Sequence, residues 1–353
     1  MKLSDDDIGV GPIAIATRAL YEATTSRPMA ESWDRAPTGM RPYIDFLYGA
    51  LGEQSPAVGT WVGPEPHPLV DSGHCTVGFS GGKDSLATAL LARKDGYEVT
   101  LFHVRGLNRA WPDEVRFARE CSEITGMPLV EITVHPSGEK KGIPEPVSKN
   151  QVIVAAMVEW ATTQGVGPAF SMGMVNGDRL GSEHPLSYVH DTEDAHLLFG
   201  QWLEQEAPGY RAPLYLRGVA ESAAVVAGYE DRRLLYASHG CMAQMRFRPG
   251  YRARAEAKFG VVLLPGRCGT SCPKCTSEYV ILYHLNALEE NELSEEMYRA
   301  AREYLGRRPL YDAATRPDLA GLTKDELVEK YMEWDLLTEY RREQGGWPRA
   351  YAS

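Results

Sequence analysis

The sequence lacks a long uninterrupted hydrophobic stretch. No window approaches the roughly 18 consecutive apolar residues that indicate a transmembrane helix. The first residues, MKLSDDDIGVG, carry acids where a signal peptide would have a basic segment followed by an apolar run. Both absences predict a cytoplasmic protein without a membrane partner.

The sequence also lacks an excess of positive charge. It has 37 Lys and Arg against 48 Asp and Glu, a formal net charge of −11. Broad binding to nucleic acid depends on clustered basic residues that displace counterions, so this balance argues against such a partner. A small molecule or a protein fits better. The otherwise ordinary composition of the 353 residues excludes global disorder, collagen and coiled coil.

Cysteine is scarce, which excludes a disulfide scaffold. There are six cysteines, and three of them, Cys268, Cys272 and Cys275, fall within eight residues. In a reducing compartment, such a cluster indicates metal binding rather than disulfide bridges. Cys75 and Cys121 stand apart from the cluster, and we expect both to be small buried hydrophobic residues.

Apolar runs alternate with segments of helical spacing from Cys75 onward. A strand at 75–79, a helix at 84–95 and a strand at 98–104 form a βαβ unit. The pattern continues with helices near 113–125, 150–163 and 193–206, and strands at 128–134, 169–175 and near 232–237. This alternation predicts an α/β fold with a doubly wound, mainly parallel sheet that binds ligands at the carboxyl ends of its strands.

Three segments are predicted along the chain. Residues 1–72 form an N-terminal extension with one helix near 12–24, and residues 73–290 form the α/β domain. Residues 291–353 form a helical C-terminal extension; helices are expected over 276–288 and most of 293–344.

The strongest local motif is Ser-Gly-Gly-Lys-Asp-Ser at Ser80–Ser85, which we call the glycine loop. It lies between a predicted strand and a predicted helix, where adjacent glycines and a helix start present backbone donors to an anion such as a polyphosphate. Ser80 and Ser85 can donate hydroxyls, Lys83 adds charge, and Asp84 can orient the loop or contact a phosphate-bound metal. The alternative is a purely structural role, in which an N-capped helix follows a tight Gly-Gly turn and binds no ligand. The spacing matches neither a Walker A loop nor a dinucleotide-binding motif.

In this context the glycine loop resembles the PP-loop of the ATP pyrophosphatases. These enzymes adenylate a carbonyl or carboxyl oxygen and release pyrophosphate. The resemblance implies that ATP and Mg²⁺ bind at Ser80, Gly81, Gly82, Lys83, Asp84 and Ser85, and that Lys83, Asp84 and Ser85 take part in catalysis.

Further stretches, read in order, look most like the 7-cyano-7-deazaguanine synthases over roughly 72–290. These stretches are His103 to Arg105, Pro146 to Asn150, Gly173 to Asp178, Tyr188 to Phe199, and Pro213 to Glu221 followed by Cys241 and the cysteine trio. The chain departs from that family in several features. Lys149 replaces an arginine, a Tyr-Ser-Gly-Tyr-Pro segment is missing, 26 residues separate Cys241 from Cys268, and both terminal extensions are additional. The substrate or the acceptor can therefore differ.

The resemblance implies further site residues. His103, Lys149, Asn150 and Gly173 fall where that family binds the nucleotide, although His103 is as well explained by packing or by a cap. Asn176, Asp178 and Asp191 are the implied substrate residues. The carboxylates of Asp178 and Asp191 can accept from adjacent N–H donors of a purine-like ring.

Cysteines at C-x₃-C-x₂-C with Cys241 upstream can close a tetrahedral thiolate cage on zinc. Four sulfurs leave no open position, so the site would be structural. His239 competes with Cys241 as the fourth ligand, and a redox pair or a catalytic persulfide is the alternative chemistry. The basic run from Arg246 to Lys258 is either a solvated face or a platform for an anionic partner.

The implied reaction converts 7-carboxy-7-deazaguanine with ATP and ammonia to an amide and then a nitrile. Three alternatives stay open: transfer of the activated deazapurine to a protein amine in antiviral defence, sulfur transfer to tRNA, and a non-catalytic nucleotide sensor. The resemblance also suggests a homodimer.

Overall fold

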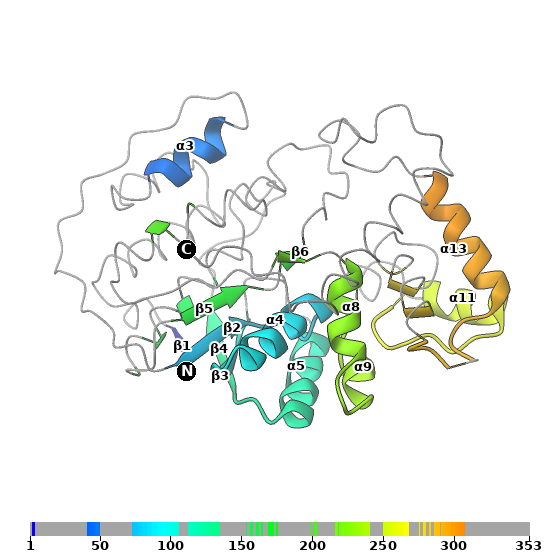
Figure 1. The fold of residues 1–353 in the computed structure, drawn as a ribbon, viewed down its shortest axis with the longest axis horizontal. Helices are drawn as coiled ribbons and strands as arrows, with labels where there is room; N and C mark the ends of the chain where they lie inside the picture. The colour runs from blue at the N-terminus through cyan, green and yellow to red at the C-terminus, as the bar shows by residue number, and fades with distance from the viewer. Residues whose placement is uncertain are drawn as a thin grey trace.

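The computed structural model describes residues 2–3, 41–49, 73–105, 112–134, 169–172, 174–175, 216–217, 219–240, 250–267 and 291–307 (Figure 1). It also describes single residues and short runs between 153 and 202 and between 275 and 289.

The centre of the described structure is a parallel β-sheet. Its strands are β1 (Lys2–Leu3), β2 (His74–Gly78), β3 (Glu98–Arg105), β4 (Leu129–Val134) and β5 (Ala169–Met172). They lie in the order β1-β4-β3-β2-β5, and every neighbouring pair is parallel. The α/β class and the parallel sheet predicted from the sequence are thus confirmed. The edge strand β1 comes from the segment that the sequence predicts to be an extension.

Helices α4 (Lys83–Lys94) and α5 (Pro112–Thr125) connect β2 to β3 and β3 to β4. Because both connections step across the sheet in the same direction, right-handed crossovers place the two helices on one face. Leu101 of β3 belongs to the same buried cluster as Leu86 of α4. The next residue, Phe102, points to the opposite face and there meets the ring of Trp160, 5.7 Å away between centroids.

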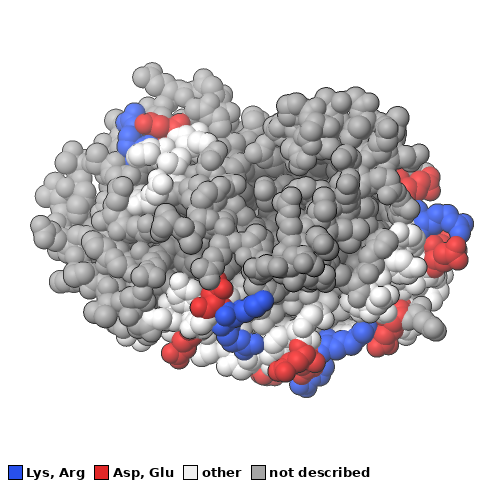
Figure 2. Space-filling view, viewed as in Figure 1, with Lys and Arg blue, Asp and Glu red and all other residues white. Residues whose placement is uncertain are grey.

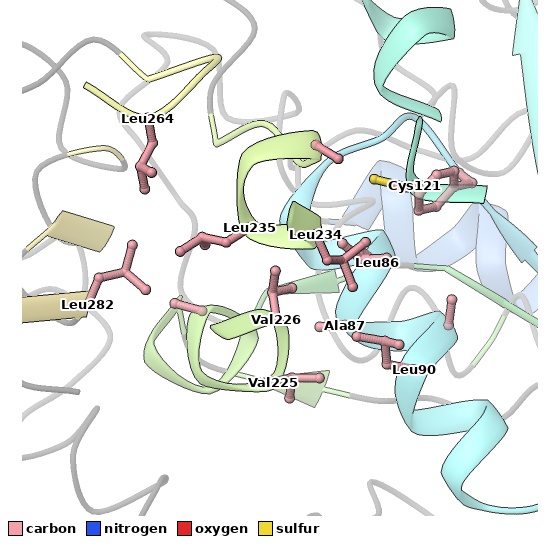
Figure 3. Packing of buried hydrophobic residues seen from close by; sticks show 14 of the residues in the cluster. Leu86, Ala87, Leu90, Cys121, Val225, Val226, Leu234, Leu235, Leu264 and Leu282 are labelled. Carbon is pink, nitrogen blue, oxygen red and sulfur yellow. The ribbon is translucent and has the colours of Figure 1, made fainter. Parts of the chain in front are cut away.

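Two further helices, α8 (Val219–Ala227) and α9 (Arg233–Ala237), contribute to the hydrophobic core. The first packs against α4 and the second against α5. Side chains from both converge with those of α4, as Figure 3 shows for Val225, Val226, Leu234 and Leu235. Their burial places the core between the sheet and this helical layer.

The strand predicted near 232–237 is wrong, because these residues form the short helix α9. Leu234, Leu235 and Ala237 are buried in it. The carboxylate of Asp231 accepts the backbone N–H of Arg233 at 3.0 Å, which satisfies a donor at the helix start. A five-residue helix is too short to show a helical period, so its buried pair of leucines has the pattern of a strand.

The predicted strand at 169–175 is divided between two sheets. β5 ends at Met172, whereas β6 (Met174–Val175) pairs in parallel with β7 (Leu216–Arg217). For the helices predicted at 150–163 and 193–206, the structure describes only individual helical residues, among them the buried Met157 and Trp202.

Helices also lie outside the α/β core. The first is α3 (Arg41–Gly49), which the sequence analysis did not anticipate, whereas the predicted helix near 12–24 lies outside the described residues. On the C-terminal side are α11 (Tyr251–Phe259) and α13 (Glu295–Arg307). Leu293 and Met297 belong to the main buried cluster, so the chain continues to contribute to the core past residue 290. No described helix is long and apolar enough to span a membrane.

Candidate functional site

The glycine loop follows the carboxyl end of β2 and leads directly into α4. Gly82 is the residue that precedes the helix, with φ −76° and ψ 150°, and no side chain of the described residues caps this helix start. The amides of the first turn of a helix have no acceptor within the helix, and the helix dipole is positive there. In α4, the amide of Lys83 donates to the carbonyl of His239 at 3.0 Å, so the helix dipole and the other amides of the first turn are what would favour a bound anion.

Gly81 adopts a backbone conformation that only glycine tolerates here. Its φ is +82°, and a Cβ at this position would lie 2.5 Å from Cβ of Phe117 and 2.9 Å from the amide nitrogen of Ala118. Helix α5 therefore lies directly against the loop. The glycine predicted to permit the turn is also required for close packing.

Lys83, Asp84 and Ser85 form the first turn of α4. The side chain of Lys83 is only 1% exposed, and its Nζ lies 2.6 Å from Oδ1 of Asp84. The hydroxyl of Ser85 donates to the carbonyl of Gly82 at 3.0 Å. In this conformation the Ser85 proton is used within the loop, whereas the sequence analysis expects it to be donated to phosphate.

His103, near the end of β3, contacts the chain just before the glycine loop. Its Nδ1 lies 2.7 Å from the carbonyl of Phe79. A carbonyl only accepts, so Nδ1 carries the proton and Nε2 is the acceptor in the neutral ring. Burial lowers the pKa of His103 despite its hydrogen bond to Phe79 and the nearby charge of Glu131. The side chain supports the loop from the sheet, which agrees with the packing alternative.

Next to His103, Glu131 of β4 binds two guanidinium groups. In the sheet it stands opposite His103. It accepts from Arg105, and it accepts from Arg119 at 2.6 and 3.1 Å. Burial by itself would raise the pKa of Glu131, but the two arginines hold it below its ordinary value. The sequence analysis did not single out this cluster.

His239 lies against the glycine loop, although it is 159 positions from Ser80 in sequence. Its Nε2 donates to the carbonyl of Ser80 at 3.1 Å. Burial lowers its pKa to about 4, and its Nδ1 has no hydrogen-bond partner among the described residues. By its residue type and position, His239 is an alternative zinc ligand to Cys241. With Nε2 on the loop, only Nδ1 is available for that role.

Arg267 and Glu278 form a buried ion pair behind His239. Their side chains are 0% and 1% exposed, and Nη2 of Arg267 lies 2.7 Å from Oε1 of Glu278. The guanidinium also donates to the carbonyls of Leu235, Ser238 and Pro265. Neither residue was anticipated as part of the site. The only sequence signal is that Arg267 precedes a cluster cysteine.

Three cysteines are described, and all are buried. Cys75 and Cys121 lie in the hydrophobic core, as predicted. Burial raises the pKa of the Cys121 thiol to about 12, and it raises that of Cys75 further. Cys275, the described member of the cysteine cluster, is also fully buried.

Nine predicted site residues lie outside the described residues: Lys149, Asn150, Gly173, Asn176, Asp178, Asp191, Cys241, Cys268 and Cys272. Within the described part of the chain, no three His, Cys, Asp or Glu side chains are grouped so as to hold a metal ion.

Part of the predicted basic run lies in α11. Arg252 donates to the carboxylate of Glu256 at 3.0 Å and to the carbonyls of Leu263 and Leu264. Lys258 lies over the ring of Phe259, 4.6 Å from its centroid. These two cations are therefore engaged within the protein.

The comparisons with known proteins identify no family. No protein-family model matches the chain, and no curated protein matches it in sequence.

Proposed function

We propose that the chain is an ATP-dependent, pyrophosphate-releasing C–N ligase of the PP-loop ATP pyrophosphatase type. Its proposed substrate is 7-carboxy-7-deazaguanine or a closely related deazapurine acid. The observation that carries the proposal is the glycine loop itself, which joins a central parallel strand to a helix whose N-terminus has no side-chain cap. Ligands of parallel α/β sheets bind at the carboxyl ends of the strands, which is where the glycine loop lies.

The residues of the loop suit a polyphosphate. Gly81 and Gly82 have no side chain to obstruct a phosphate, and the start of α4 supplies backbone donors and a partial positive charge. Lys83 adds a full charge in a buried position, where Coulomb interactions are strong. Its ion pair with Asp84 keeps that charge compensated before a nucleotide binds. Mg²⁺, held by the phosphates and Asp84, would offset the remaining negative charge.

In the proposed reaction, a carboxylate oxygen of the acid attacks the α-phosphorus of ATP, and the bond to the β-phosphate breaks. The products are an acyl-adenylate and pyrophosphate. Ammonia then attacks the acyl carbon, AMP leaves, and loss of one proton gives the amide. The amide oxygen then attacks the α-phosphorus of a second ATP and releases a second pyrophosphate. Loss of AMP and of the two protons on nitrogen gives the nitrile.

The chain's own groups have defined tasks in this scheme. Lys83 and the loop amides stabilise negative charge on the departing phosphates. His103 and Glu131 maintain the end of β3 beside the loop. The proposed roles of Lys149, Asn150 and Gly173 in nucleotide binding, and of Asn176, Asp178 and Asp191 in substrate binding, rest on the family resemblance.

A structural zinc site at Cys241, Cys268, Cys272 and Cys275 fits the described neighbours of these residues. Gly240, which precedes Cys241, packs so closely on Arg267 and Glu278 that a Cβ would collide with the Glu278 carboxylate. Arg267 precedes Cys268 in sequence. Two of the four cysteines thus directly follow residues that are in close contact, and four thiolates are a donor set that zinc prefers.

The surface charges agree with a small-molecule substrate. On the face that Figure 2 shows, the described Lys and Arg side chains alternate with Asp and Glu. A polyanion would need a continuous basic patch. The net charge of −11 favours the deazapurine acid over RNA as substrate.

The test is release of pyrophosphate and AMP by zinc-quantified protein with Mg-ATP and 7-carboxy-7-deazaguanine, with and without ammonia, followed by mass spectrometry. We expect the nitrile, and we expect Lys83→Met to abolish release while Lys94→Met, at the other end of α4, retains it. A stall at the adenylate or amide would indicate another acceptor, such as a protein amine. No substrate-dependent release would overturn the proposal and leave sulfur transfer or nucleotide sensing.

A further inference from the structure

A second backbone segment, Ser238–Gly240, runs alongside the glycine loop. The amide of Lys83 donates to the carbonyl of His239 at 3.0 Å, and the amide of His239 donates to the carbonyl of Gly81 at 3.0 Å. Gly82 and His239 thereby form a parallel bridge outside the two sheets. These reciprocal bonds fix the orientation of the peptides on both sides of Gly82.

The side chain of His239 adds a third bond to the same loop. Its Nε2 donates to the carbonyl of Ser80 at 3.1 Å. On its other side, the imidazole lies near the ring of Phe117, with centroids 5.3 Å apart. The backbone and side chain of His239 together hold one group each of Ser80, Gly81 and Lys83. A glycine-rich loop has little intrinsic preference for one conformation, so these bonds largely define its shape.

His239 is itself held by the buried pair. Arg267 donates to the carbonyl of Ser238, and its Nη2 lies 3.3 Å from the hydroxyl of Ser238. The partner of Arg267, Glu278, is in close contact with Gly240. The residues before and after His239 are therefore fixed by the same ion pair, and the position of His239 depends on it.

We propose that His239 is a positioning residue of the glycine loop, and that the Arg267–Glu278 pair fixes the turn that carries it. His239 does not touch the ligand in this scheme. It keeps the amides of the loop in the arrangement that an anion needs, so its loss weakens ligand binding by disordering the loop. The predicted loss of ATP affinity rests on the proposed function. The predicted loss of order in the loop without nucleotide does not depend on it.

The first experiment is hydrogen–deuterium exchange on the full chain without nucleotide, followed at the peptide that spans the glycine loop. We expect exchange in His239→Ala to be about five- to tenfold faster than in the wild type, which corresponds to loss of one hydrogen bond to a buried carbonyl. His239→Gln, whose amide N–H can still donate to Ser80, should restore part of the protection. Leu293→Ala removes buried packing away from the loop and is the matched control.

Equal exchange in the wild type and His239→Ala would overturn the proposal, as would an equal increase in Leu293→Ala. The second experiment measures the dissociation constant of Mg-ATP by calorimetry. We expect His239→Ala to weaken binding about five- to tenfold. If the wild type binds no ATP, the proposed function fails, and the exchange comparison still decides the role of His239. If His239→Ala binds ATP like the wild type, the positioning role fails and the proposed function stands.

Discussion

At the scale of single residues, Gly81 is a position of the site that two separate constraints reserve for glycine. Its positive φ and the contact of α5 constrain it independently. The first constraint acts on the backbone and the second on the space available for a side chain. Gly96, in the turn after α4, has a φ of +95°, but a Cβ added there would meet nothing within 4 Å. A comparison of Gly81 with Gly96 therefore separates backbone strain from steric overlap with α5.

We expect Gly81→Ala to lower the free energy of unfolding by about 2 to 4 kcal/mol, because left-handed strain adds to overpacking against Phe117. Gly96→Ala should cost only about 1 to 2 kcal/mol, from strain alone. Urea denaturation of both variants and the wild type measures the difference. Equal costs would show that α5 yields to the new methyl group.

The lowered pKa of His103 predicts that the free energy of unfolding depends on pH. Burial keeps its folded-state pKa below the ordinary value of 6.5, against the opposing effects of the Phe79 carbonyl and Glu131, while Arg105 and Arg119 act in the same direction as burial. The unfolded chain therefore takes up a proton first as the pH falls through 6.5. Stability from this residue is fully present above that pH and is lost below it.

Urea unfolding of the wild type and His103→Gln at pH 7.5, 6.5 and 5.5 tests this sign. Gln keeps a donor for the Phe79 carbonyl and does not titrate. We expect the free energy of unfolding to fall less steeply toward pH 5.5 in the variant than in the wild type. Above pH 6.5 the two proteins should differ only by a constant amount. The titration of Glu131 does not affect this comparison, because its lowered pKa places that titration at more acidic pH. Parallel curves would contradict the prediction.

At the scale of elements, the sequence predicted the βαβ unit within about one residue. Helix 84–95 and strand 98–104 were expected, and α4 (Lys83–Lys94) and β3 (Glu98–Arg105) are observed. Glycines and charged residues bound these apolar runs sharply, so local signals suffice. The error at 232–237 and the division of 169–175 have a different origin. The five residues of α9 are too few to show a helical period, and the division of 169–175 depends on the pairing of β6 with the distant strand β7.

The glycine loop was predicted for the same local reason, because its six residues are contiguous. The contribution of His239 was not. It acts largely through backbone groups, which every residue possesses, and across 159 positions from Ser80. The sequence marked His239 only as a metal-ligand type. Arg267 and Glu278 were missed because a buried ion pair has no spacing rule between separate elements.

Arg267, in the segment after α11, joins Glu278 to the end of α9. Removing one charge of this pair should lower the free energy of unfolding more than removing both. Glu278→Leu should lower the free energy of unfolding by about 3 to 5 kcal/mol, since it leaves a buried charge uncompensated. The double variant Arg267→Met with Glu278→Leu removes both charges and should recover part of that loss. Full recovery is not expected, because the carbonyls of Leu235, Ser238 and Pro265 lose their donor. Urea denaturation compares the three proteins. A double variant less stable than Glu278→Leu would contradict this.

At the scale of the whole molecule, the proposed cysteine site and the glycine loop share one support. Gly240 precedes Cys241 and Arg267 precedes Cys268. Gly240 belongs to the turn that carries His239, and Arg267 donates to the carbonyl of Ser238 in the same turn. A change at the cysteines should therefore reach the loop without any movement of the sheet. This coupling needs only the connectivity of the chain and the contacts of the buried ion pair.

We expect purified protein to contain about one zinc per chain, and chelation to speed hydrogen exchange in both Ser238–Gly240 and the glycine loop. Elemental analysis and exchange before and after chelation measure the two effects. Cys275→Ser should lose the metal, whereas Cys121→Ser, equally buried but in α5, should keep it. Retention of zinc by Cys275→Ser would remove this residue from the ligand set.

The bridge between Gly82 and His239 also has a consequence for synthesis of the chain on the ribosome. The strand and helix on either side of the glycine loop can form early from neighbouring residues, but the bonds that define the loop need residues 238–240, and their support needs residue 278. Such non-local contacts are slow to form, since a long connection must close first. A nascent chain that ends before Glu278 would carry the entire motif and still lack its native shape. Truncations at successive lengths would show whether nucleotide binding begins only beyond that point.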